Sequence, residues 1–171
     1  MTRLLGYDSI PLKIPSDLVG FGGGPVRLST KGRYGVKAMV DLALHSGGEQ
    51  PVPLKDIADR QEISEHYLEQ LIAGLRKAGL VKSVRGAQGG YLLAQAPDAI
   101  VVGDIIRTLE GTIAPADCVA EGAPVNCERA DNCVTRILWE KIHDSINSVV
   151  NSITLQDMVN EYKRLNGQES M

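Results

Sequence analysis

The chain contains three cysteines, and all of them fall within one short segment, at Cys118, Cys127 and Cys133. Their pattern is C-x8-C-x5-C, with no C-x-x-C pair. Thiolates are the usual protein ligands of iron–sulfur clusters, and a segment interrupted by Gly122 and Pro124 can wrap around a single cluster. Since an odd number of cysteines cannot all pair in disulfides, the count favours metal or redox chemistry.

Two alternatives remain open on spacing alone. A closed zinc site needs four nitrogen or sulfur ligands, usually with paired spacing, which is absent here. The other alternative is a cluster-free thiol switch, because a thiolate near Arg129 or Arg136 would have a lowered pKa and react with oxidants.

The segment before these cysteines predicts a DNA-binding fold. A helix is expected from Ser29 to His45, followed by a short helix in "LKDIADRQ", the link "EIS", and a helix that begins after Ser64 and ends before Gly79. Two short strands, 81–85 and 90–94, flank a glycine-rich turn. This order is typical of a winged helix-turn-helix, so the predicted fold class is mostly α with a small β-hairpin wing. The inward residues predicted for the first helix are Tyr34, Met39, Val40, Ala43 and Leu44.

The segment after the hairpin predicts a linking helix in "VGDIIRTLEG", the cysteine loop, a long helix, and a last helix capped by Thr154 with Asp157 in capping-box position. We expect the long helix to pair with its copy in a second chain, giving a homodimer and a pseudo-palindromic DNA site. The apolar stripe of this long helix consists of Leu138, Ile142, Ile146, Val149, Val150 and Ile153. The expected parts are a disordered or non-native extension (1–25), a DNA-binding domain (26–96), a linking helix and cysteine loop (97–133), a dimerisation helix (134–153) and a C-terminal helix and tail (154–171).

The residues expected to contact DNA lie in three places. The start of the second helix of a helix-turn-helix reaches base edges, and the corresponding outward side chains are Ser64, His66, Glu69 and Gln70. The hairpin offers Arg85 and Gln88. Lys31 and Arg33 are expected to contact phosphates, which position the protein without specifying sequence.

Charge and composition agree with this interpretation. Residues 26–95 hold ten Lys/Arg and seven Asp/Glu, whereas residues 96–171 hold six and twelve. A basic half beside an acidic half suits a nucleic-acid module joined to a second function. The sequence has no run that could cross a membrane and no signal peptide, which predicts a cytoplasmic protein. We expect no enzyme, because the three histidines are scattered, each at a surface or helix end: His45, His66 and His143.

The stretches "VRLSTKGRYGVKAMVDLAL", "ISEHYLEQLIAGLRKAGLVKSVRGAQGGYLLA", the cysteine loop and "LWEKI…NSITLQDMV" together resemble the IscR-type iron–sulfur cluster regulators. The resemblance covers about residues 26–160. It implies a homodimeric winged-helix transcription factor that binds double-stranded DNA, senses a cluster, commonly [2Fe–2S], and controls genes such as those for cluster assembly. It also implies that the three cysteines are cluster ligands, and that Ser64, Glu69, Gln70 and Arg85 contact DNA.

One departure from the family pattern concerns the fourth ligand. The best-known members have a histidine three residues after the third cysteine, whereas this chain has Arg136, which has no lone pair to donate. His143 lies about 15 Å farther along a helix than Cys133, too far for the same cluster. The remaining candidates are a side chain of the partner subunit or one of four acidic residues of the loop: Asp117, Glu121, Glu128 and Asp131.

Overall fold

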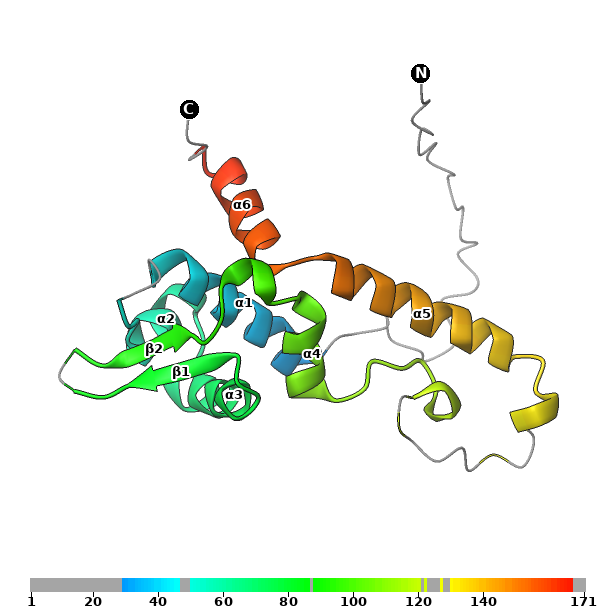
Figure 1. The fold of residues 1–171 in the computed structure, drawn as a ribbon. Coiled ribbons are helices and arrows are strands. Elements are labelled where there is room, and N and C mark those ends of the chain that lie inside the picture. Colours follow the sequence, from blue (N-terminus) through cyan, green and yellow to red (C-terminus); the bar gives the residue numbers. More distant parts are fainter. Residues whose placement is uncertain are drawn as a thin grey trace, which may run out of the picture.

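The computed structural model describes residues 29–46, 50–86, 88–120, 122, 127 and 130–167. The predicted N-terminal extension therefore lies outside the described residues. Six helices and one hairpin are present in these ranges (Figure 1), which confirms the mostly helical class with a small β-hairpin. Their bounds are α1 (Thr30–His45), α2 (Leu54–Gln61), α3 (Glu65–Lys77), β1 (Val81–Val84), β2 (Gly90–Leu93), α4 (Val102–Glu110), α5 (Arg136–Ser152) and α6 (Leu155–Leu165).

Helix α1 runs through the middle of the core. Ser29 caps it by accepting a hydrogen bond from the N–H of Lys31 at 3.1 Å. Its fully buried apolar residues are Ala38, Met39 and Leu42. Of the residues predicted to face inward, Met39 is fully buried, whereas Tyr34, Val40 and Ala43 pack against the core and are only partly buried. The buried side also holds Gly32, Gly35 and Asp41, which carry no apolar signal. The core that surrounds α1 is built from Ile57, Leu68, Ile72, Leu75, Ile100, Ile105 and Leu155.

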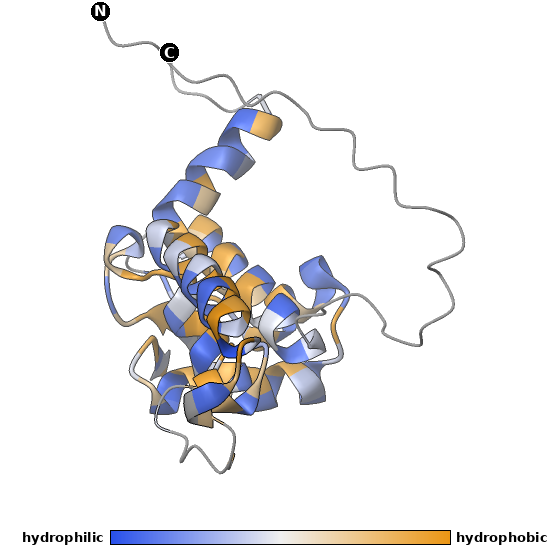
Figure 2. Ribbon diagram, turned by 90° about the vertical axis from the view of Figure 1, so that its right-hand side faces the viewer, coloured by the Kyte–Doolittle hydropathy of each residue, from blue (hydrophilic) through white to orange (hydrophobic). Residues whose placement is uncertain are grey.

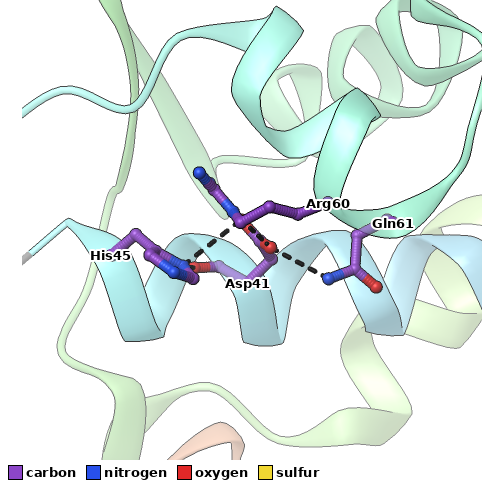
Figure 3. A network of polar contacts seen from close by, with 4 residues as sticks. All are labelled: Asp41, His45, Arg60 and Gln61. Carbon is purple, nitrogen blue, oxygen red and sulfur yellow. Dashed lines mark hydrogen bonds and ion pairs between the residues drawn. The ribbon is translucent and has the colours of Figure 1, made fainter.

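Helices α1 and α2 are joined by an ion pair that the sequence did not predict. The Asp41 carboxylate is 1% exposed and accepts hydrogen bonds from both Nε and Nη2 of Arg60, at 2.9 and 2.6 Å. Gln61 donates a further hydrogen bond at 2.9 Å, and His45 lies one turn along α1 from the same aspartate (Figure 3). This network fixes the angle between α1 and the first helix of the helix-turn-helix.

The turn between α2 and α3 sets the direction of α3. Glu62 adopts the left-handed conformation, with φ of 54°, and ends α2. Ile63 is buried, and Ser64 then caps α3 by accepting a hydrogen bond from the N–H of Tyr67. Gly79, with φ of 76°, follows α3 in the left-handed conformation, as the sequence predicted.

The hairpin packs against the end of the loop that precedes α2. Strands β1 and β2 are antiparallel, with Val81 opposite Leu93 and Val84 opposite Gly90. Val52 pairs with Tyr91 on the other side of β2 through two hydrogen bonds of 2.9 Å. A Cβ at Gly90 would lie 2.4 Å from the carbonyl oxygen of Val52, so only glycine fits there.

Helices α5 and α6 extend from this core in different directions (Figure 1). The chain returns to the core between them, where Val102 donates to the carbonyl of Ile153 and Leu155 donates to that of Ile100. Helix α6 carries the predicted capping box between Thr154 and Asp157. Helix α6 mixes hydrophobic and hydrophilic residues along its length (Figure 2), as expected of a helix with one side turned to water. Among the helices that the structure describes, none is both long and apolar enough to cross a lipid bilayer.

Candidate nucleic-acid interface and cysteine loop

Helix α3 presents one polar face to solvent. Its buried side consists of Leu68, Leu71, Ile72 and Leu75. The candidate base-reading residues Ser64, His66, Glu69 and Gln70 are all exposed. Among them, Gln70 and His66 form a hydrogen bond, with 3.1 Å between their Nε2 atoms. All four side chains therefore lie exposed near the start of the helix that the sequence predicted to read DNA.

The hairpin and α1 add basic and amide groups. Arg85 and Gln88 are exposed at the tip of the hairpin, where Gly86 has a φ of 118°. Lys31 and Arg33 are exposed in the first turn of α1. These groups carry the hydrogen-bond donors that phosphate contacts require.

The first turn of α1 also receives a carboxylate that sequence reasoning missed. Glu110, the last residue of α4, accepts a hydrogen bond from the N–H of Gly32 through Oε1 at 2.8 Å. The residue lies 78 positions away in sequence, so no local pattern could have predicted the contact. A carboxylate at a helix N-terminus is favoured by the free N–H groups there.

The cysteine loop connects α4 to α5 through two short 3-10 helices, Asp117–Val119 and Ala130–Asn132. All three cysteines are free thiols. Cys118 lies in the first 3-10 helix, which packs against α5, and Cys133 lies between the second and the start of α5. Glu121, Glu128 and Arg129 fall outside the described residues, as does the side chain of Asp131, so these candidates keep the status of predictions.

Cys133 lies in a setting that stabilises its thiolate. Its Sγ is 3.1 Å from the Thr135 hydroxyl. That hydrogen bond, followed by the backbone N–H groups of Thr135 and Arg136 and by the positive charge of Arg136, lowers the pKa of the Cys133 thiol. A thiolate is the form that binds metals and reacts with oxidants.

The start of α5 lies between two shallow hollows, one beside Cys118 and one beside Cys133. Arg136 and Glu140 line both hollows, and Arg136 Nε donates to Glu140 at 2.8 Å. Arg136 thus forms an ion pair within α5, in keeping with its inability to serve as a metal ligand.

His143 differs from the sequence-based expectation of a surface or helix-end residue. It is only 8% exposed and lies in the middle of α5, so that expectation was wrong. Its Nδ1 donates to the carbonyl of Ile113 at 3.1 Å, and its Nε2 is 2.9 Å from the Asn147 amide nitrogen. His143 also lines the hollow beside Cys118. The ring therefore holds the entry to the cysteine loop against α5, a contact between residues 30 positions apart.

The cysteines supply the soft sulfur donors that a cluster or zinc requires. The described residues include no group of three or more His, Cys, Asp or Glu side chains arranged to hold a metal ion. Much of the segment between Cys118 and Cys133 is not among them. The donor chemistry fits a cluster, while the ligand set stays a prediction.

Comparison with known proteins points to one family. The Rrf2 family model, described as an iron-dependent transcriptional regulator, matches residues 28–161. The chain is 49% identical over 133 residues to the HTH-type transcriptional regulator CymR of Bacillus subtilis strain 168, covering 78% of this chain and 89% of the relative. It is 47% identical over 140 residues to the HTH-type transcriptional regulator IscR of Erwinia tasmaniensis, covering 82% of each.

Solved structures give the same result for the fold. The structure of CymR (YrzC), the global cysteine regulator of B. subtilis, matches with a TM-score of 0.65 and 48% identity, covering 80% of this chain and 98% of that one. T. potens IscR matches with a TM-score of 0.67 and 52% identity, covering 86% and 94%.

Proposed function

The chain belongs to the Rrf2 family of DNA-binding transcriptional regulators, and from this premise we propose that it is a homodimer whose DNA binding is controlled by an iron–sulfur cluster. The observation that carries the proposal is the set of three free thiols in the single loop that joins the DNA-binding elements to α5. The homologues are transcriptional regulators rather than enzymes.

DNA reading is assigned to α3 and the hairpin. Glutamine can bond adenine through two atoms, and a carboxylate can accept from the cytosine amine, so Gln70 and Glu69 carry sequence preference. Ser64 and His66 lie on the same exposed face. The DNA backbone or a groove edge is contacted by Arg85, Gln88, Lys31 and Arg33. These contacts supply DNA affinity that falls as the salt concentration rises.

Dimerisation is assigned to α5. The helix has 17 residues, and His143 is its one buried residue. Apolar side chains remain exposed at both ends, including Ile137 (62%), Leu138 (52%) and Val149 (58%). Exposed apolar side chains of this size along one helix mark an interaction surface. A second copy of α5, related by a two-fold axis, would cover it and would set the two α3 helices about one DNA turn, roughly 34 Å, apart.

The cluster site is assigned to Cys118, Cys127 and Cys133, with [2Fe–2S] as the cluster type that the family resemblance implies. Asp117, exposed beside Cys118, and a side chain of the partner subunit are the candidates for the fourth ligand. A bound cluster would supply sensitivity to iron supply and to oxidants. A non-cysteine ligand suits this role, because it holds the cluster less firmly than a fourth thiolate.

The position of the loop between α4 and α5 supports a coupling between the cluster and the placement of α3. It begins directly after α4, which packs against α1 and α3, and it ends at α5. Ordering the loop around a cluster changes how α4 and α5 sit relative to each other, and with them the two α3 helices of a dimer. Such coupling between sites is typically worth about 1–3 kcal/mol.

The test compares three forms of the full chain: cluster-loaded protein purified without oxygen, the same protein after chelation, and the triple Cys→Ala variant. We expect iron and inorganic sulfide in the first form and a changed affinity or site preference in the other two. A colourless protein with stoichiometric zinc would redirect the proposal to a zinc regulator. Equal DNA binding by all three forms would contradict cluster control and leave the family assignment intact.

A cluster-free thiol switch is the second candidate, and the position of Cys133 favours it. The thiol lies at the start of α5 with Thr135 as hydrogen-bond partner. One solved relative, 38% identical, is described as the oxidized form of Staphylococcus aureus CymR. If this candidate holds, iron-free protein should change its DNA affinity on peroxide treatment, and Cys133→Ser should abolish that response.

A further inference from the structure

Two candidate DNA-reading residues contact each other on the exposed face of α3. His66 and Gln70 are separated by four positions, which places them one helical turn apart on the same side. Gln70 Nε2 lies 3.1 Å from His66 Nε2. Both side chains are exposed, on the side of the helix opposite Leu68 and Leu71.

The atoms in this contact determine how the glutamine amide is turned. A glutamine amide has one acceptor oxygen and an NH2 group with two donors, whereas a neutral imidazole has one donor and one acceptor nitrogen. The amide nitrogen faces the ring, so this contact is a hydrogen bond in the tautomer that carries its ring proton on Nδ1, where Nε2 of His66 accepts. In that tautomer, an amide turned by 180° would place its oxygen against the lone pair of Nε2, which is repulsive.

With the ring proton on Nδ1, the contact leaves Gln70 with one free N–H and its oxygen in a defined orientation. Adenine presents N7 as an acceptor and N6–H2 as a donor in the major groove, which one N–H and one oxygen satisfy together. Guanine presents two acceptors, O6 and N7, and the Gln70 oxygen would oppose one of them. Holding the amide in place also reduces the side-chain freedom that DNA binding must remove.

We propose that His66, with its ring proton on Nδ1, is a positioning residue for sequence recognition: it holds the amide of Gln70 in the orientation that reads adenine and rejects guanine. The inference rests on the proposed function, since it needs α3 to lie in the major groove. It assigns to His66 a role exerted through Gln70 rather than through its own contact with a base.

The experiment uses the full-length protein and four variants. Selection from random duplexes with the wild type identifies the preferred site, and Gln70→Ala identifies the base pair that Gln70 reads by the loss of preference there. Affinity is then measured for duplexes with each of the four base pairs at that position. The variants compared are His66→Ala, His66→Gln, Gln70→Ala and the double variant His66→Ala/Gln70→Ala.

We expect the wild type to prefer adenine, and His66→Ala to reduce the preference for adenine over guanine by roughly three- to tenfold. Affinity for DNA of unrelated sequence should stay within about twofold, since the phosphate contacts that supply it are unchanged. His66→Gln, which keeps an acceptor oxygen at a similar distance from the helix, should retain more of the preference than His66→Ala. The double variant should match Gln70→Ala, because His66 acts only through Gln70.

A matched control is available on α6, where Gln156 Nε2 donates to Asn160 Oδ1 at 2.8 Å across the same four-residue spacing. Asn160→Ala should leave base preference unchanged.

An undiminished adenine preference in His66→Ala would overturn the inference, and so would an equal loss of affinity for all four base pairs, which would indicate a direct phosphate contact. Failure of the wild type to select any sequence would instead overturn the proposed DNA reading by α3.

Discussion

Glu110 Oε1 accepts a hydrogen bond of 2.8 Å from the backbone N–H of Gly32. Glu110 is the last residue of α4, directly before the cysteine loop, and Gly32 lies between Lys31 and Arg33. The contact therefore joins the start of the loop to the turn of α1 that is proposed to contact DNA phosphates. The hydrogen bond thus connects the proposed cluster-binding loop directly with the proposed phosphate-contacting turn.

Glu110→Ala should lower the free energy of unfolding by about 1–2 kcal/mol, because it removes a charge-assisted hydrogen bond at a helix N-terminus. Glu110→Gln keeps an acceptor oxygen and should cost less than the alanine variant. Urea unfolding followed by circular dichroism measures both. If Glu110→Ala is as stable as the wild type, the contact does not contribute to folding.

Gly35→Ala should destabilise the protein although alanine is the better helix former. A Cβ at this position would lie 2.0 Å from Cδ1 of Leu109, so the leucine must move out of its place against α1. We expect a net loss of about 1–2 kcal/mol. Leu109→Ala opens the space, so Gly35→Ala should cost less in that background. Equal costs in the two backgrounds would show that the clash is relieved elsewhere.

Arg60→Met should cost about 3 kcal/mol, because it keeps the apolar stem and leaves the buried carboxylate of Asp41 without its charge partner. The matched control is Lys55→Met on the same helix, which breaks the exposed ion pair with Asp59. That change should stay within about 0.5 kcal/mol. Thermal and urea unfolding compare the two, and similar costs would mean that the buried network has no special role.

The capping contact of Asp157 should make the stability of the protein depend on pH in the acid range. The hydroxyl of Thr154, and then its backbone N–H, donate to this carboxylate and lower its pKa from the usual value of 3.8. Its stabilising contribution is therefore complete above that value and is lost as the pH falls through the lower folded-state pKa. The Tm difference between wild type and Asp157→Ala should be largest near neutral pH and should shrink in strong acid. A difference that does not change with pH would contradict the capping role of the charge.

Leu138→Glu tests the proposed dimer. The side chain is 52% exposed on α5, so glutamate costs the isolated chain little but would be buried without a partner in an interface. We expect the wild type to sediment as two chains and the variant as one. Leu165→Glu changes an even more exposed leucine, 70%, on α6 and should leave the dimer intact. A monomeric wild type would refute the assignment of α5.

Local signals allowed much of the fold to be predicted. Ser64 and Thr154 cap helices and Gly79 ends one because each acts on N–H groups or dihedral angles within a few residues of itself. The order of helices and strands then indicated the winged helix-turn-helix. The sequence also placed the candidate base-reading residues on the outward face of α3, because the apolar stripe of that helix is regular.

The contacts of Asp41, Glu110 and His143 could not be predicted in this way. Each of these polar residues is bound to a partner 19 to 78 positions away. Asp41 and His143 are also buried, although His143 was expected at a surface or helix end. Hydrophobic periodicity reports which residues avoid water, and it says nothing about which distant donor meets a buried carboxylate.

The sequence alone therefore determined the element order, the helix ends and the chemistry of the three thiols, since these depend on residue type and near neighbours. Only the tertiary structure decided that Glu110, at the end of α4, contacts the first turn of α1 and that His143 holds the cysteine loop to α5. It also decided that Ile137, Leu138 and Val149 of α5 stay exposed in one chain. The reason is that such contacts form between segments which folding alone brings together.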